Sequence, residues 1–328
     1  NSVTGVQTCA LPIFSIMSKV LVFGHANPDT DSIASAISYA YLLNQTGHEA
    51  TAYALGAPSE ETQFALDHFG VAAPKVIEKA AEVADADTIL ALVDHNEAQQ
   101  SLPDRGDYRI WSVVDHHRIA NIETVEPLNY RAETVGCTST ILYKMYNEQG
   151  VDIPKDMAGM MLSAVISDTL LMKSPTCTPE DEAAIIALAA LAGVDYNTYG
   201  LDLLKAGTNL SAKSCEELLD LDAKSFPMGN ATVRIAQVNT VDVNDVLTRK
   251  AELTELMQKN SEKEGYDLFV LLITNILDSN STALITGSET AKVESAFGVT
   301  VTDGLAELAG VVSRKKQVVP PLTKAFEG

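Results

Sequence analysis

Short, strongly apolar runs alternate with longer amphipathic segments over the first 205 residues of the chain. The runs indicate buried strands of a parallel sheet, because strands covered on both faces carry apolar side chains at most positions. Apolar positions at helical spacing separate and follow these runs. The predicted strands span 19–24, 50–54, 88–93 and 109–114, and the predicted helices span 29–47, 60–69, 136–149, 155–171 and 180–191. This alternation predicts an α/β domain with a doubly wound, mainly parallel sheet.

The pattern changes after residue 205. An apolar segment over 232–238 precedes a helical pattern over 243–264, and two further apolar runs follow at 268–276 and 283–286. Asp278, Ser279, Asn280 and Ser281 separate the last two runs, which favours a hairpin. We therefore predict a smaller C-terminal α+β domain with a mixed sheet. The predicted boundaries are 17–205 for the first domain, 206–211 for a linker and 212–328 for the second domain.

Residues 1–16 differ from the rest of the chain. They contain no charged residue, and Pro12 interrupts their apolar part. A secretory signal would begin with basic residues. Met17 resembles a natural start that leads directly into the first strand. We therefore expect residues 1–16 to be a foreign or disordered extension.

Composition narrows the classes of function. The net charge of −21 argues against nonspecific nucleic-acid binding, which depends on basic surface. No run approaches 18 uninterrupted apolar residues, so we expect no membrane span. The four cysteines are far apart and form no Cys-x-x-Cys pair, which disfavours a zinc or disulfide scaffold and fits a reducing cytoplasm.

Histidines and acidic residues gather where the predicted strands end. The clusters are His25, Asp29 and Asp31 after the first strand, Asp94 and His95 after the 88–93 strand, Asp115, His116 and His117 after the 109–114 strand, and Asp168 near the end of the 155–171 helix. Ligand sites of open α/β sheets lie at the carboxyl ends of the strands, so we expect these side chains to meet. Carboxylates and a few imidazoles gathered there predict a divalent-metal site.

Structural explanations exist for each cluster taken alone. Asp29 and Asp31 could simply cap the following helix, and Asp168 could bond a nearby backbone amide. Consecutive histidines at a buried strand end, however, are costly unless they are bound or hydrogen-bonded. Four of the six histidines fall in these clusters, which favours the metal site.

A basic run near the C-terminus complements the acidic clusters. Arg314, Lys315 and Lys316 are adjacent in an otherwise acidic chain. The planar guanidinium of arginine suits phosphate, and lysine adds a point charge. A solvated basic patch is the alternative. Together with a metal site, the run indicates phosphoryl chemistry.

The five clusters, in this order, resemble those of the family II inorganic pyrophosphatases of the DHH phosphoesterase superfamily. The motifs are His-Ala-Asn-Pro-Asp-Thr-Asp, Asp-His-Asn-Glu, Asp-His-His, Ser-Asp-Thr and Ser-Arg-Lys-Lys-Gln, and the resemblance extends from Met17 to the C-terminus. It implies a DHH catalytic domain, a DHHA2-type C-terminal domain, and a cytoplasmic homodimer.

The resemblance also implies roles for individual residues. Two Mn²⁺ or Co²⁺ ions per subunit are implied, with an additional Mg²⁺ that arrives with the substrate. The implied ligands of one ion are His25, Asp29, Asp94 and Asp168, and those of the other are Asp31, Asp94, His116 and Asp168. Four residues are implied to bind pyrophosphate and act in catalysis, namely His117, Lys224, Arg314 and Lys315. His95 and Asp115 are implied to orient the ligands.

The implied reaction is hydrolysis of inorganic pyrophosphate to two phosphates by a hydroxide that two metal ions activate. A short-chain polyphosphatase or another DHH phosphoesterase is the enzymatic alternative. Nucleotide-acting relatives usually carry a Gly-Gly-x-His type motif in the second domain, and this chain has Ser313 and the basic run instead. The alternative outside enzymes is a phosphate- or nucleotide-sensing module, which the complete set of ligand residues disfavours.

Overall fold

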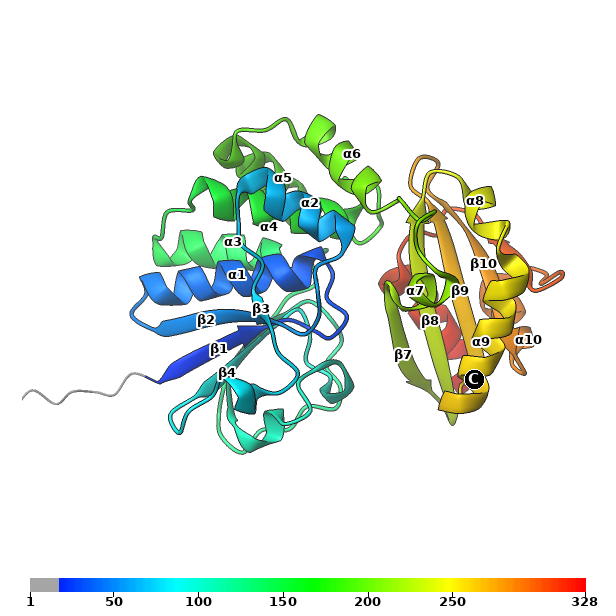
Figure 1. Cartoon of the computed structure of the whole chain (residues 1–328), viewed down its shortest axis with the longest axis horizontal. Helices are drawn as coiled ribbons and strands as arrows, with labels where there is room; N and C mark the ends of the chain where they lie inside the picture. Colours follow the sequence, from blue (N-terminus) through cyan, green and yellow to red (C-terminus); the bar gives the residue numbers. More distant parts are fainter. Residues whose placement is uncertain (1–17) are drawn as a thin grey trace, which may run out of the picture.

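The structure is a computed structural model that describes residues 18–328, so the prediction for residues 1–16 lies outside the described residues. The chain forms two domains, each built on one sheet (Figure 1). The first sheet has six parallel strands in the order β3-β2-β1-β4-β5-β6, and the second has five strands in the order β11-β10-β9-β8-β7. The predicted fold class, a mainly parallel α/β domain followed by a smaller mixed-sheet domain, is confirmed.

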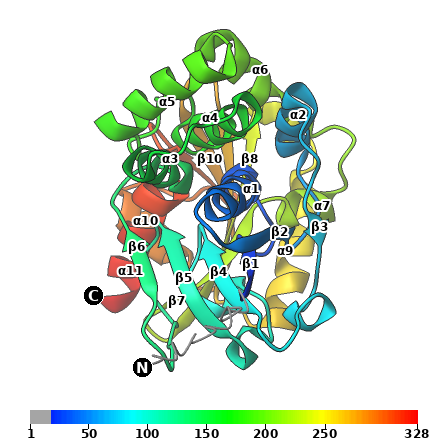
Figure 2. The same cartoon turned by 90° about the vertical axis from the view of Figure 1, so that its left-hand side faces the viewer.

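Helices cover one face of the parallel sheet, and loops with short 3-10 turns cover the other (Figures 1 and 2). The strands are β1 (Lys19–Phe23), β2 (Glu49–Ala54), β3 (Lys75–Val76), β4 (Ile89–Val93), β5 (Arg109–Asp115) and β6 (Asn129–Ala132). The helices are α1 (Thr30–Gln45), α2 (Glu60–Phe69), α3 (Thr138–Gln149), α4 (Lys155–Thr169), α5 (Pro179–Ala192) and α6 (Tyr196–Ala206). Because both faces are covered, the apolar side chains of β1, β4 and β5 are almost all buried.

The second domain packs helices on both faces of its sheet. Its strands are β7 (Ala223–Met228), β8 (Ala231–Thr240), β9 (Leu268–Asn275), β10 (Asn280–Gly287) and β11 (Leu305–Leu308). Its helices are α7 (Cys215–Asp220), α8 (Val243–Leu247), α9 (Lys250–Glu264), α10 (Thr290–Phe297) and α11 (Val319–Glu327). Strands β8 and β9 pair in parallel and the other neighbours pair antiparallel, so the predicted hairpin of β9 and β10 and the mixed sheet are confirmed.

One predicted helix is divided. The pattern over 243–264 predicts a single helix, but α8 ends at Leu247 and α9 begins at Lys250. Arg249, at the break, turns its guanidinium to the carbonyls of Lys213 and Leu210. Arg249 has non-helical backbone angles (φ −105°, ψ 17°), which divide the helix, and its contacts hold the segment before α7 against the start of α9.

The helices within residues 18–328 are too short or too polar, taken singly, to cross a membrane. Among them, only α5 and α6 taken together, bent by 97°, satisfy the length and composition.

Candidate metal centre

The predicted clusters meet at the carboxyl edge of the parallel sheet, where the strand order reverses. Strand β1 pairs with β2 on one side and with β4 on the other. Chain connections therefore leave β1 and β4 in opposite directions, which opens a crevice at their carboxyl ends. His25 follows β1, Asp94 follows β4, and His116 follows β5. The sheet topology alone thus brings these three side chains together.

The turn after β1 combines helix capping with a second use of the same carboxylate. A Cβ at Gly24 would lie 1.9 Å from Ser32 Oγ, so only glycine lets the start of α1 approach the strand so closely. Asp29 Oδ1 accepts a hydrogen bond from the Ser32 amide at 2.9 Å, as a helix cap does. Asp29 Oδ2 lies 3.3 Å from His25 Nε2. Capping and the predicted metal ligation therefore use different oxygens and do not exclude each other.

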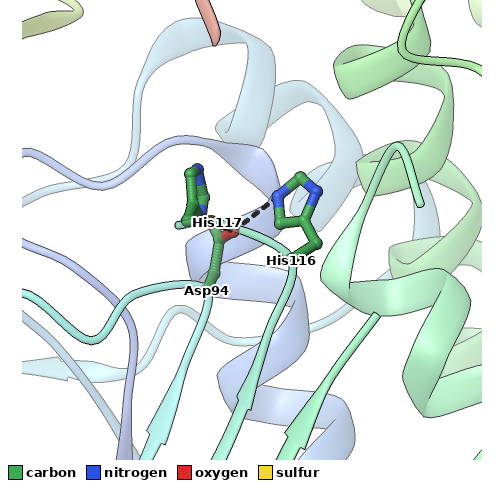
Figure 3. A group of neighbouring side chains, drawn as sticks. All are labelled: Asp94, His116 and His117. Carbon is green, nitrogen blue, oxygen red and sulfur yellow. Dashed lines mark hydrogen bonds and ion pairs between the residues drawn. The ribbon is translucent and has the colours of Figure 1, made fainter. Parts of the chain in front are cut away.

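Asp94 lies between His25 and His116, and Figure 3 shows it beside His116 and His117. Its Oδ2 is 3.4 Å from His25 Nε2, and its Oδ1 is 3.1 Å from His116 Nε2. The residue has a φ of 58°, in the left-handed region that aspartate tolerates better than most side chains. This arrangement, with one oxygen facing each histidine, supports the prediction that Asp94 bridges two ions.

Two more carboxylates complete the group. Asp168, in the last turn of α4, places Oδ2 3.7 Å from His116 Nε2, and Asp31 Oδ2 lies 3.9 Å from the same nitrogen. Asp31 is held firmly, because it accepts hydrogen bonds from the Thr138 and Ser139 amides at the start of α3. Asp168 makes no side-chain hydrogen bond within residues 18–328. All six predicted ligands are therefore brought together around Asp94.

The donor atoms suit bound cations. Buried His25 Nε2 makes no hydrogen bond to the described residues, although it faces one oxygen each of Asp29 and Asp94, so a cation placed between these atoms would give it a partner. Burial and then Asp31, Asp29 and Asp94 raise the pKa of Asp168 well above its ordinary value. Burial and then Asp94 likewise raise the pKa of Asp31 to about 6, because carboxylates this close repel one another without a counter-ion. Carboxylate oxygens with two imidazoles favour ions such as Mn²⁺ or Co²⁺.

Cys137 is a neighbour that the sequence did not reveal. Its sulfur lies with oxygens of Asp31 and Asp168 in a group whose atoms are all within 4.8 Å of one another. Burial raises the pKa of the thiol well above its ordinary value, so it stays neutral and is a poor ligand. The sequence signal that could have pointed to Cys137 was its position at the start of the predicted 136–149 helix.

The two residues predicted to orient ligands are placed differently. Asp115 Oδ1 accepts hydrogen bonds from His117 Nδ1 at 2.8 Å and from the His116 amide at 2.8 Å. It therefore fixes the tautomer and direction of His117, with the other ring nitrogen unprotonated while the ring is neutral. His95 instead bonds the Val93 carbonyl and Ser101, and it has no hydrogen bond to a predicted ligand in the described part of the chain.

Side chains of the second domain face the metal-ligand group across one cavity of about 310 Å³. Lys224, Arg314 and Lys315 all line it. Arg314 is only 10 % exposed, and its guanidinium binds the Asp222 carboxylate at 2.6 Å. Lys315 Nζ crosses the domain interface and lies 2.8 Å from His116 Nδ1. The structure thus brings the predicted cations to the predicted ligands.

One further polar residue of the cavity escaped sequence reasoning. Asn239, on β8, lines the cavity, and its Oδ1 is buried without a hydrogen-bond partner in the described structure. Nothing in the 232–238 apolar pattern marks the residue that follows it, so no sequence signal identified it.

Comparisons with known proteins identify the family of both domains. The model of the N-terminal domain of the DHH family matches residues 19–165, and the DHHA2 domain model matches residues 201–325. An Enterococcus faecalis protein named "Probable manganese-dependent inorganic pyrophosphatase" is 62% identical over 310 residues, or 94% of this chain and 100% of the relative. A Shouchella clausii protein of the same name is 57% identical over 94% of this chain and 99% of its own length.

A solved structure extends the likeness to three dimensions. The crystal structure assigned to a family II inorganic pyrophosphatase of Methanococcus jannaschii has a TM-score of 0.85 and 39% sequence identity. The match covers 94% of this chain and 100% of that one. With relatives this similar over their full length, the chain belongs to the family II, or manganese-dependent, inorganic pyrophosphatases of the DHH superfamily.

Proposed function

We propose that this protein hydrolyses inorganic pyrophosphate to two phosphates. The observation that carries the proposal is the cavity itself, in which carboxylates and imidazoles of one domain face three cations of the other. A small anion with two phosphate groups would place one phosphate against each wall of the cavity. The relatives named as manganese-dependent inorganic pyrophosphatases support the same reaction.

The predicted ligands would hold two divalent ions, with Asp94 and Asp168 common to both sets as the resemblance implies. The six residues that would hold the ions are His25, Asp29, Asp31, Asp94, His116 and Asp168. Bound there, a pair of ions would lower the pKa of a shared water towards neutrality and offset the charge of the transferred phosphoryl group.

The side chains around the ions have separate tasks. Lys224 and Lys315 neutralise charge that develops on the leaving phosphate, and Arg314 presents a guanidinium that Asp222 already holds in place. Burial, and then His116, lower the pKa of His117 to about 4, so its ring is neutral at pH 7 before substrate arrives. A bound phosphate opposes this shift, because its negative charge favours the imidazolium, which donates from both nitrogens.

A substitution at Arg314 tests whether the phosphate-binding cations act separately from the metal ligands. We expect Arg314→Ala to lower kcat/KM by about 10²–10³, because a buried, oriented donor to the developing charge is lost. Metal content should stay at the wild-type level, since Arg314 is bonded to Asp222 and Ile235 of its own domain and to none of the predicted ligands. Arg109→Ala removes an exposed arginine from the amino end of β5 and serves as the control. Loss of bound metal in the Arg314 variant would contradict the assignment.

Substrate choice distinguishes the proposal from its alternatives. We expect pyrophosphate to have a kcat/KM at least about tenfold above that of tripolyphosphate, ATP or a dinucleotide. Beyond Lys224, Arg314 and Lys315, the cavity residues offer a third phosphate or a base one more cation, Arg118, and Glu97 already pairs with it. Phosphate release measured with Mn²⁺ and with Mg²⁺ decides the matter. Equal hydrolysis of tripolyphosphate would indicate a short-chain polyphosphatase, and cleavage of the dinucleotide a nuclease-like enzyme. Binding without turnover would indicate a sensing module.

The finer expectations belong to the same proposal. We expect two Mn²⁺ or Co²⁺ ions per subunit, an additional Mg²⁺ with the substrate, a homodimer and a cytoplasmic location. The domain boundaries at 205, 206–211 and 212 also stay predictions. Metal analysis of the purified protein tests the number of ions per subunit, and its mass in solution tests the homodimer.

A further inference from the structure

Glu61 lies in the first turn of α2, outside every motif used above, yet it contacts two segments of the metal-ligand group. Its Oε1 accepts a hydrogen bond from Thr30 Oγ1 at 2.6 Å and another from Ser167 Oγ at 2.6 Å. Thr30 is the residue between the two aspartates at the start of α1, and Ser167 directly precedes Asp168. One oxygen therefore joins the two segments, which are more than 130 residues apart in sequence.

We propose that Glu61 is a positioning residue of the metal centre, whose Oε1 sets the separation between the ligands on α1 and Asp168 on α4. This inference rests on the proposed metal centre. Glu61 itself reaches no ion and no substrate in this arrangement. It acts by holding the backbone on either side of the carboxylates.

The end of α4 needs such support. Asp168 makes no side-chain hydrogen bond within residues 18–328, so its position depends on the backbone around it, where its carbonyl accepts a hydrogen bond from Thr176 Oγ1. The next residues, Leu170, Leu171 and Met172, all have positive φ, at 46°, 52° and 67°. Left-handed backbone costs about 1–2 kcal/mol per residue for side chains of this kind. A strained turn that directly follows a ligand persists only when surrounding contacts hold it.

Electrostatics acts against the same arrangement. Asp31 on α1 and Asp168 on α4 both place a carboxylate oxygen within 4 Å of His116 Nε2, so the two side chains face one another. Like charges at this spacing favour separation of the two helices. The two hydroxyl hydrogen bonds to Glu61 oppose that separation. Ions would therefore meet a group of ligands that already has the spacing they require.

Glu61 is itself well placed for this task. Thr62, the next residue on α2, also lies 3.0 Å from Thr30 through its hydroxyl oxygen, so the contact to α1 is double. A Cβ at Gly207 would lie 3.3 Å from Glu61 Cβ, which shows that the chain leaving α6 for the second domain packs against this side chain. Burial is the larger effect and raises the pKa of Glu61 above its ordinary value, while the hydrogen bonds from Ser167 and Thr30 offset part of this rise.

The test measures Mn²⁺ binding directly, on full-length protein stripped of metal, from the electron paramagnetic resonance signal of free Mn²⁺. We expect Glu61→Ala to raise the dissociation constant by about 10–100-fold, as the loss of contacts that orient ligands generally does. Glu61→Gln retains an oxygen that can accept both hydroxyls, so its dissociation constant should stay within about threefold of wild type. At saturating Mn²⁺, kcat of Glu61→Ala should recover to within about threefold, since no reacting group is lost.

Two further variants control the measurement. Asp67→Ala removes an exposed carboxylate from the same helix, and its dissociation constant should equal that of wild type. Ser167→Ala removes one of the two donors, and it should weaken Mn²⁺ binding in the same direction but less. Ser167→Ala is also the deciding variant if Glu61→Ala does not fold.

Several outcomes would overturn the proposal. Wild-type Mn²⁺ affinity in Glu61→Ala or in Ser167→Ala shows that the tether has no role. Equal weakening in the alanine and glutamine variants shows that charge, and not the accepted hydrogen bonds, is what matters. Because the measurement uses no pyrophosphate, an inactive wild-type protein that binds Mn²⁺ as expected contradicts the proposed reaction and not the role of Glu61.

Discussion

Asp94→Asn is expected to lower kcat/KM for pyrophosphate by at least about 10³, because a carboxylate that faces both predicted ion positions loses its charge. Contacts that merely orient ligands are each worth about 10–100-fold in metal affinity, so a ligand shared by two ions should be worth more. Asparagine keeps the shape of the side chain and also tolerates the left-handed φ of 58°. The substitution therefore tests charge with little change in the backbone. Metal content measured after dialysis should fall for both ions together.

A matched control exists elsewhere in the chain. Asp303 also has a left-handed φ, of 52°, and it pairs with Lys250 on the surface of the second domain. Asp303→Asn should leave metal content and turnover unchanged. If Asp94→Asn protein retained two equivalents of metal and normal turnover, Asp94 would not be a bridging ligand.

His117→Ala is expected to lower kcat/KM by about 10²–10⁴, the range for loss of a positioned acid–base group. The geometry separates this effect from metal binding. His117 Nδ1 is engaged by Asp115 Oδ1 at 2.8 Å and lies farther, 3.6 Å, from Asp94 Oδ1. Metal content should consequently stay near that of wild type while turnover falls.

The neighbouring histidine supplies the contrast for this prediction. His116 Nε2 points at Asp94, so His116→Ala should lose metal as well as turnover. His48→Ala, a change at a histidine that packs on Trp111 away from the cavity, should alter neither. Metal loss in His117→Ala would instead make both histidines ligands.

The strands that form the site were predictable because their signals are local. Buried parallel strands require continuous apolar runs, and β1, β4 and β5 have them. Strand β6, by contrast, has the sequence Asn-Tyr-Arg-Ala at the edge of the sheet, where exposure removes the need for apolar side chains. Its position comes from pairing with β5, which the sequence of β6 does not encode. Helix α6 was also missed. Its residues, Tyr196–Ala206, lie directly before the predicted linker.

The ligand residues were likewise recognisable, whereas their partners were not. Each cluster combines residue types that are costly to bury near the end of a strand or a helix. The partner of Arg314, however, is Asp222, which lies 92 positions earlier and directly before β7. Glu61 had the appearance of an ordinary acidic residue in the first turn of a helix. Contacts of this kind depend on tertiary packing, and no spacing rule along the chain predicts them.

Lys315 already lies beside His116, across the interface between the domains. Its ammonium is thus a resident counter-ion for the buried carboxylates of the first domain. Divalent ions held by those carboxylates would repel this ammonium, whereas a phosphate in the cavity would attract it. Lys315 therefore links the two walls of the cavity electrostatically, since charge placed on either wall acts on the same ammonium.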